Sequence, residues 1–311
     1  MSRPTPAFRG PALLLIAAAG CSFAGPEEPV FVPGRSYLGQ NGYIEYLAGN
    51  APLILSAGHG GSLVPAELPD RTAERCGGTV VVVTDLNTAE LAVRVRAAFL
   101  ARYGSWPHVI INHLSRRKLD PNREEGEAAC GNPAAETAFQ EWHRFIAIAR
   151  EAATTQTGGG WYVDLHGHGH SEQRLELGYL LDGATLGQSD AALDADPRFE
   201  RESSIWSFSR EYPGSFSALL RGPASLGGRY EAEGYRAVPG PSEPDPGGMP
   251  YFEGGVNTRR HTCGTRAIAP GGKVCGVQLE ANFTGVRDTP ENRQRFAEAT
   301  VKVMADFLPR P

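Results

Sequence analysis

The chain has 311 residues, of which 41% are hydrophobic and 21% are charged, and its net charge at pH 7 is −5. These values are typical of a globular protein and exclude a composition typical of disorder. The charge is mild and no basic stripe is visible, so we expect no nucleic-acid partner. The length suits one large α/β domain or two small ones.

The N-terminal segment, residues 1–21, has the pattern of an export signal. Two arginines precede an apolar run at 11–19, which is too short to span a bilayer. The run leads through Ala-Ala-Gly into Cys21, as in a bacterial lipobox, where the cysteine is lipidated. We therefore expect an exported protein of the bacterial cell envelope (periplasm or outer membrane), anchored to the membrane by a lipid on Cys21. The alternative is an ordinary signal peptide cut near Gly20 or Ala24.

Four further cysteines predict two disulfides, because an exported protein folds in an oxidising compartment. Three pairings are possible. Cys263–Cys275 closes a short loop and is the preferred pair, which leaves Cys76–Cys130. A cysteine-rich metal site is disfavoured because the chain has no Cys-x-x-Cys motif.

The elements that follow predict an α/β domain. Residues 22–50 are rich in Pro and Gly and predict a tether and a peripheral segment with a hairpin around 37–46. A single catalytic domain is then expected over 51–311. Apolar runs typical of strands buried on both faces occur at 53–56, 79–84, 108–112, 161–165 and 274–279.

Helical patterns alternate with these runs. Asn87 with Glu90 predicts a capped helix start, residues 136–153 have helical apolar spacing, and Thr289 caps a terminal helix. The alternation predicts a largely parallel sheet with helices on its faces. Residues 171–260 break it, and we expect a long, loop-rich insertion there that shapes the mouth of a site.

Polar residues follow or end the apolar runs. In open α/β sheets, sites form where the carboxyl ends of the strands meet. We therefore expect one crevice that contains His59, Asp85, His113, Asp164, His166 and Glu280.

This set of side chains indicates metal chemistry. Two imidazoles and a carboxylate with one open position form the usual catalytic zinc site, in which zinc activates water. His59 and His166 are the preferred ligands, and Glu280 is available as a general base. His168 is expected next to the ligands or facing the substrate, and His170 on the surface.

Two other features support this hypothesis. Asp164 lies two residues before His166 and is placed to orient a ligand imidazole. The stretch 115–123 carries Arg116, Asn122 and Arg123 around an Asp-Pro-Asn turn, which suits recognition of a substrate carboxylate. The alternative for this stretch is a solvated basic loop.

Taken in order, these motifs resemble those of the N-formylglutamate amidohydrolase family, a branch of the zinc carboxypeptidase-like superfamily. The resemblance covers about half of the chain. The matching segments are Gly58–Ser62 with Pro65, Asp85, Ser115–Arg116, Asp120–Arg123, Asp164–His168 and Gln278–Glu280.

The resemblance implies a three-layer α/β/α fold, a Zn²⁺ cofactor and hydrolysis of an amide bond. His59 and His166 match the family's two histidine ligands. Ser62 stands where carboxypeptidases have an acidic ligand, so that role is carried to Asp85, with Glu67 as the fallback. Glu280 matches the base. The family's carboxylate-binding pair matches Asn122 and Arg123, with Arg116 as a partner.

We therefore expect a zinc-dependent hydrolase acting on an N-acyl, N-formylglutamate-like amino acid or a small peptide that bears a free carboxylate. The alternatives are a zinc carboxypeptidase acting on peptides or cell-wall fragments, and a catalytically silent binding lipoprotein of the envelope. A serine hydrolase is set aside because no Gly-x-Ser-x-Gly motif occurs.

Overall fold

The structure is a computed structural model that describes Met1 and residues 30–309. The predicted export signal and Cys21 lie outside the described residues. Residues from Phe31 onward form one compact unit. Among the helices of the described residues, none is long and apolar enough to cross a membrane.

The central element is an eight-stranded sheet in the order β1-β2-β4-β3-β5-β8-β6-β7. Its four middle strands, β4, β3, β5 and β8, are mutually parallel, whereas β1, β2 and β6 join by antiparallel pairing. The prediction of a mostly parallel sheet is confirmed. The strand bounds are β1 Ser36–Leu38, β2 Ile44–Leu47, β3 Leu53–Ala57, β4 His108–Asn112, β5 Gly160–Gly167, β6 Leu175–Gly178, β7 Ala237–Val238 and β8 Val274–Ala281.

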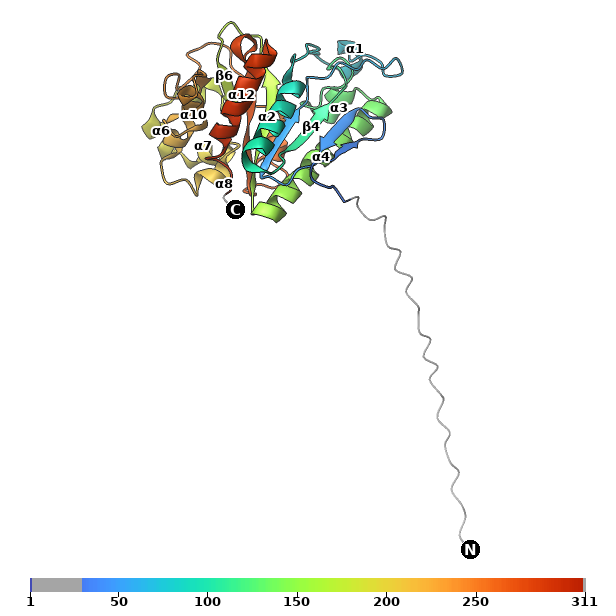
Figure 1. Cartoon of the computed structure of the whole chain (residues 1–311), viewed down its shortest axis with the longest axis horizontal. Helices are drawn as coiled ribbons and strands as arrows, with labels where there is room; N and C mark the ends of the chain where they lie inside the picture. The colour runs from blue at the N-terminus through green and yellow to red at the C-terminus, as the bar shows by residue number, and fades with distance from the viewer. Residues whose placement is uncertain (2–29, 310–311) are drawn as a thin grey trace. The chain divides into compact units, whose positions relative to one another are not determined.

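Helices cover both faces of the sheet. Helices α2 and α12 lie side by side over one face (Figure 1), and α4 contacts the strands from the other. The helix bounds are α1 Ala73–Cys76, α2 Thr88–Tyr103, α3 Glu125–Ala129, α4 Pro133–Thr157, α5 Gly183–Leu186, α6 Asp190–Ala195, α7 Pro197–Glu202, α8 Trp206–Ser209, α9 Phe216–Arg221, α10 Leu226–Ala232, α11 Val256–His261 and α12 Pro290–Met304, with an irregular turn at Phe283–Arg287.

The strand sequences explain the layers. Alternate residues of a strand point to opposite faces of the sheet. Leu55 and Trp161 pack in the core under α2 and α12, while their neighbours Ile54 and Tyr162 pack under α4. The apolar runs of β3 and β5 are therefore buried on both sides, as the sequence predicted.

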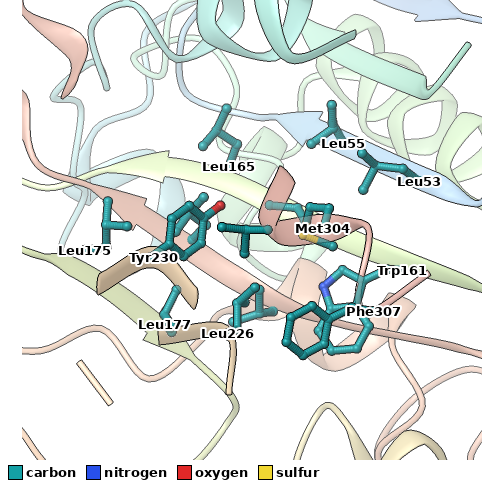
Figure 2. Packing of buried hydrophobic residues seen from close by; sticks show 14 of the residues in the cluster. Leu53, Leu55, Trp161, Leu165, Leu175, Leu177, Leu226, Tyr230, Met304 and Phe307 are labelled. Atoms are coloured by element: carbon teal, nitrogen blue, oxygen red, sulfur yellow. The ribbon is translucent and has the colours of Figure 1, made fainter. Parts of the chain in front are cut away.

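The core under α12 also extends to β6 and α10. Figure 2 shows Leu53 and Leu55 of β3 near Trp161 of β5, with Met304 and Phe307 from the C-terminal region. The rings of Trp161 and Phe307 have centroids 5.2 Å apart. Burial of each such side chain contributes about 1.5–3 kcal/mol, so this contact fixes the chain end on the sheet.

Two helix starts contrast with each other. The Thr289 side chain accepts a hydrogen bond from the backbone N–H of Asn292, so the predicted cap of α12 is confirmed. The predicted start of α2 is confirmed, because the helix begins directly after Asn87, but the predicted side-chain cap is wrong. Asn87 has a φ of 68° and its side chain donates to the Arg287 carbonyl at 2.8 Å. The side chain of Thr88 donates instead to the Asp85 carbonyl at 2.8 Å, which ties the helix start to the site.

The strand predicted at 79–84 is absent. This segment is an irregular loop with exposed valines at 81, 82 and 83. Its β-branched residues favour a strand only where a partner strand is free to pair with them. Both sides of β3 are already occupied, by β4 and β5.

Two expected boundaries also differ. The predicted hairpin around 37–46 is present as β1 and β2, but the sheet begins before residue 51, because β2 pairs with β4 and buries Ile44 and Tyr46. Residues 171–260 are rich in loops, as expected, but they also contain the short helices α5 to α10, the start of α11, and strands β6 and β7. Strands β6 and β7 extend the central sheet, so residues 171–260 belong to the same domain as the sheet.

Both predicted disulfides are present. Cys263 pairs with Cys275 across a sequence separation of 12. Cys76 pairs with Cys130 across a separation of 54. The second bond links α1, just before the valine-rich loop, to the end of α3.

Candidate metal centre and its surroundings

The site lies where the parallel strands end. His59 follows β3 by two residues, and His166 and Glu280 are register partners in the last part of β5 and β8. Asp85 arrives by a different route, since no strand precedes it. Its backbone N–H donates to the His59 carbonyl at 3.0 Å, which places it beside this histidine.

Glycine allows the loop after β3 to reach this position. A Cβ atom on Gly61 would lie 2.4 Å from the backbone carbonyl oxygen of Asn112. The Asn112 side chain, at the end of β4, donates to the Gly58 carbonyl at 2.9 Å. The loop that carries His59 is therefore held tightly against β4.

Three buried side chains present ligand atoms to one another. The Nδ1 atom of His166 lies 3.0 Å from Nδ1 of His59 and 3.1 Å from Oδ2 of Asp85. Nδ1 of His59 lies 3.3 Å from the same Asp85 oxygen. Zinc–nitrogen bonds of 2.0–2.1 Å in a tetrahedron separate two ligand atoms by about 3.3 Å. The three atoms therefore fit three corners of a tetrahedral cation site.

The far side of each imidazole is held by its own buried carboxylate. Nε2 of His59 lies 2.6 Å from Asp120, and Nε2 of His166 lies 2.9 Å from Asp164. With its Nε2–H donated to a carboxylate, each ring presents the Nδ1 lone pair that a metal ligand requires. Asp120 in turn accepts from Arg116 Nε at 2.8 Å.

The charges of the site reinforce this arrangement. Burial alone would lower the pKa of His166, but attraction to Asp164 outweighs it and raises that pKa well above its usual range. Burial alone would raise the pKa of Asp120, but the charge of His59 holds it well below the usual range. The pKa of Asp85 is also lowered: burial opposes this, and His59 and His166 together outweigh it. The carboxylates of Asp85, Asp120 and Asp164 therefore all favour a cation between the two imidazole rings.

Glu280 has a different environment. Its Oε1 atom accepts from the Gln278 side chain at 2.9 Å, whereas Oε2 is buried and has no hydrogen-bond partner among residues 30–309. Burial raises the pKa of Glu280 to about 8. An oriented carboxylate with one free oxygen and a raised pKa suits a group that accepts a proton.

A cavity of about 460 Å³ opens on these groups. It is large enough for a small substrate. Val81, Val83, His170, Tyr251 and Phe252 are part of its lining. The lining also includes almost every residue that was assigned to the site from the sequence: His59, Asp85, Arg116, Asn122, Arg123, His166, His168 and Glu280.

The groups expected to bind a carboxylate differ in how free they are. The Asn122 side chain is buried, and its carbonyl accepts from the backbone N–H of Asn257 at 2.9 Å. Arg116 is engaged with Asp120. Arg123 is half-buried, and among the described residues the one hydrogen bond of its side chain is to the Asn122 carbonyl, at 3.0 Å. Arg123 therefore has the most donors left to face the cavity.

Three further histidines have distinct positions. His168 is fixed through both ring nitrogens, since Nε2 donates to the Arg174 carbonyl and Nδ1 accepts from the N–H of His170. His113 does not join the site: its Nε2 lies 2.9 Å from Glu45 on β2. The expectation that His170 is a surface residue is wrong, because it is half-buried and lines the cavity.

The acidic residues also differ from expectation in part. The fallback ligand Glu67 is exposed and accepts from the Tyr43 hydroxyl at 3.0 Å, and it does not join the group of three ligand atoms. Asp120 and Glu176 were not predicted as site residues. The Asp-Pro-Asn turn that contains Asp120 was the available signal, whereas nothing in the sequence pointed to Glu176.

Fold and site together define an α/β protein with a buried histidine–carboxylate centre at the carboxyl ends of its strands. The chain is similar to the crystal structure of N-formylglutamate amidohydrolase from Ralstonia eutropha JMP134, with a TM-score of 0.47 and 14% identity, covering 89% of this chain and 98% of that one. It is also similar to a gene product from Agrobacterium tumefaciens, with a TM-score of 0.44 and 13% identity, covering 85% and 93%. No protein-family model and no curated protein matches the chain.

Proposed function

We propose that the protein is a zinc-dependent hydrolase that cleaves the amide bond of an N-acyl amino acid or small peptide with a free carboxylate. One observation carries the proposal: three buried ligand atoms lie 3.0–3.3 Å apart, beside an oxygen of Glu280 that has no hydrogen-bond partner in the described part of the chain. His59, Asp85 and His166 would hold the ion. Zinc bound there would polarise the substrate carbonyl and activate a water molecule.

Side chains of the cavity would transfer the proton and bind the substrate. Glu280 is oriented by Gln278 and would accept a proton from the attacking water at Oε2. Arg123 would bind the substrate carboxylate from the cavity wall, because its planar guanidinium matches a carboxylate in two-point contacts. Asn122 would keep the loop of Arg123 in place through its bond to Asn257.

Motif order supports an N-formylglutamate-like substrate. The matched segments contain the ligand, base and carboxylate-binding residues of that family in the family's order.

For location, we propose that a lipid on Cys21 anchors the protein in the bacterial envelope. Metabolic labelling with a radioactive fatty acid tests this: label on the wild type and none on Cys21→Ser is expected, and an unlabelled wild type would refute it.

The function is tested with purified protein reconstituted with zinc. N-acyl amino acids and short peptides are offered separately, and products are identified by mass spectrometry. We expect amide cleavage, about one bound zinc per chain, and loss of turnover by at least ~100-fold in Glu280→Gln. The exposed Glu291, at the start of α12, gives a matched control in Glu291→Gln, which should behave like the wild type.

Three outcomes would contradict the proposal, and a fourth would change its substrate class. A protein that binds no zinc has a different centre. Full amidase activity in Glu280→Gln would remove the proposed base. Tight binding of N-acyl amino acids without turnover would instead favour a catalytically silent binding protein, and cleavage of peptides alone would favour a carboxypeptidase.

A further inference from the structure

A second built pair of side chains lies in the same cavity, formed by His170 and Glu176. The Nδ1 atom of His170 is 2.7 Å from Oε1 of Glu176, whose side chain is fully buried. Oε2 of Glu176 accepts from the backbone N–H of Phe252 at 2.9 Å. Both oxygens of this carboxylate are therefore occupied, so its orientation is fixed.

The ring of His170 is fixed as well. It stacks on Phe252 with centroids 4.7 Å apart and planes inclined by 20°. Its Nε2 atom has no hydrogen-bond partner in the described part of the chain, and this atom is not buried. Because His170 lines the cavity, Nε2 is the ring nitrogen left to meet a bound molecule.

The sheet register places this pair relative to the proposed base. Glu280 of β8 is the register partner of His166 on β5 and of Glu176 on β6. Residues directly opposite on neighbouring strands point to the same face of the sheet and lie about 5 Å apart. His166, Glu280 and Glu176 therefore form one row, with the metal centre on one side of Glu280 and the His170–Glu176 pair on the other.

We propose that His170 is a catalytic residue that donates a proton from Nε2 to the departing nitrogen of the substrate. This inference rests on the proposed amide hydrolysis and adds a separate acid to it. A histidine that gives its Nδ1–H to a buried carboxylate is held in the orientation suited to proton transfer at Nε2. Because Glu280 is on the metal side of His170, the base and the acid would act on different substrate atoms.

In the proposed step, Glu280 takes one proton and His170 gives one. The water oxygen bonds to the carbonyl carbon while Glu280 takes one water proton. The carbon–nitrogen bond then breaks, and the nitrogen takes the proton of His170 Nε2, so that a carboxylic acid and an amine leave. Glu280 returns its proton to solvent, and His170 takes one from solvent, which restores both groups.

A comparison of leaving groups tests this role. One substrate is an N-acyl amino acid, whose nitrogen must be protonated as it leaves. The other is the matched thioester, in which sulfur replaces that nitrogen and leaves as a thiolate with a pKa of about 8.5. In His170→Gln we expect kcat for the amide to fall ~100-fold or more and kcat for the thioester to change by less than about tenfold.

Two more variants sharpen the result. Glu176→Gln keeps an acceptor for the ring but removes the charge, and it should show the same selective loss to a smaller degree. His113→Gln is the matched control, because His113 pairs with Glu45 outside the cavity. Thioester turnover by the same preparation shows that a variant is folded.

Equal losses on both substrates in His170→Gln would show a structural role and overturn the proposal. Unchanged amide turnover in that variant would overturn it too. A wild-type protein that cleaves neither substrate would refute the proposed function itself, which distinguishes that failure from failure of the acid role alone.

Discussion

The Nδ1 atoms of His59 and His166 lie 3.0 Å apart, while the opposite nitrogen of each ring contacts a different buried carboxylate. Two imidazole lone pairs at this distance repel each other unless a proton or a cation lies between them. A metal ion satisfies both rings and Asp85 together. The pair therefore links metal binding to the stability of the fold.

Zinc should raise the thermal midpoint of the metal-free protein. A ligand present at 1,000 times its Kd stabilises the folded state by ~4 kcal/mol, which corresponds to about 10 °C for a domain of this size. Differential scanning calorimetry with and without zinc measures the shift, and a chelator should reverse it. The variant His59→Gln should show little shift. An equal shift in both proteins would place the bound zinc elsewhere.

Removing the carboxylate charge that contacts His166 should lower the zinc affinity without abolishing zinc binding. In Asp164→Asn, His166 loses the carboxylate that accepts from its Nε2, so we expect zinc affinity to fall about 10–100-fold. Competition with a fluorescent chelator measures this. Asp190→Asn is the control, since Asp190 is exposed and pairs with Arg221. Unchanged affinity in Asp164→Asn would mean that this carboxylate does not support the ligand.

The fold should lose stability as the pH falls below about 6.5. His143 is buried against His261, with its Nδ1 atom 2.7 Å from Nε2 of that ring, and burial lowers the pKa of His143 to about 3. The unfolded chain takes up the proton near pH 6.5 and the folded chain does not. The contribution of neutral His143 is therefore fully present above pH 6.5 and declines by ~1.4 kcal/mol per pH unit below it, down to about pH 3.

Urea unfolding at pH 7.0, 5.5 and 4.5 measures this dependence. We expect the free energy of unfolding to fall more steeply with pH in the wild type than in His143→Gln, which cannot take up that proton. Other buried groups, including His108 with a pKa lowered to about 4, contribute to both proteins alike. Parallel slopes for the two proteins would contradict the prediction.

The two disulfides should differ in their effect on stability. A bond across 54 residues restricts the unfolded chain more than one across 12, and the chain-entropy relation gives about 4 and about 3 kcal/mol. The double variant Cys76→Ser with Cys130→Ser should thus unfold at lower urea than Cys263→Ser with Cys275→Ser. The reverse order would show that packing around Cys263, which is fully buried, outweighs loop length.

The positions at strand ends were predictable because strand direction follows from the alternation of strands and helices. His166 and Glu280 are in strands that the apolar runs identified, and His59 follows a third. Parallel pairing then brings these residues to one edge of the sheet. The local sequence was therefore sufficient to predict that His59, His166 and Glu280 lie together.

Asp85 was selected for a reason that does not apply. The run before it is a loop, and the residue reaches His59 through a backbone hydrogen bond and through its place before α2. The roles of Asp120 and Glu176 depend on contacts between segments far apart in sequence. Such tertiary contacts leave no periodic pattern along the chain. The Asp-Pro-Asn turn indicated the segment of Asp120 but not its contact with His59, and nothing in the sequence pointed to Glu176.

The valine-rich loop has a consequence for hydration. Val81 and Val83 line the cavity, yet each remains at least 40% exposed. Water ordered over such side chains is released when an apolar group covers them, and each ~40 Å² of apolar surface removed from water contributes about 1 kcal/mol. A bound molecule whose apolar part covers Val81 and Val83 would release this water. The loop thus gives the cavity mouth an apolar surface whose contribution to binding grows with the area that a bound molecule covers.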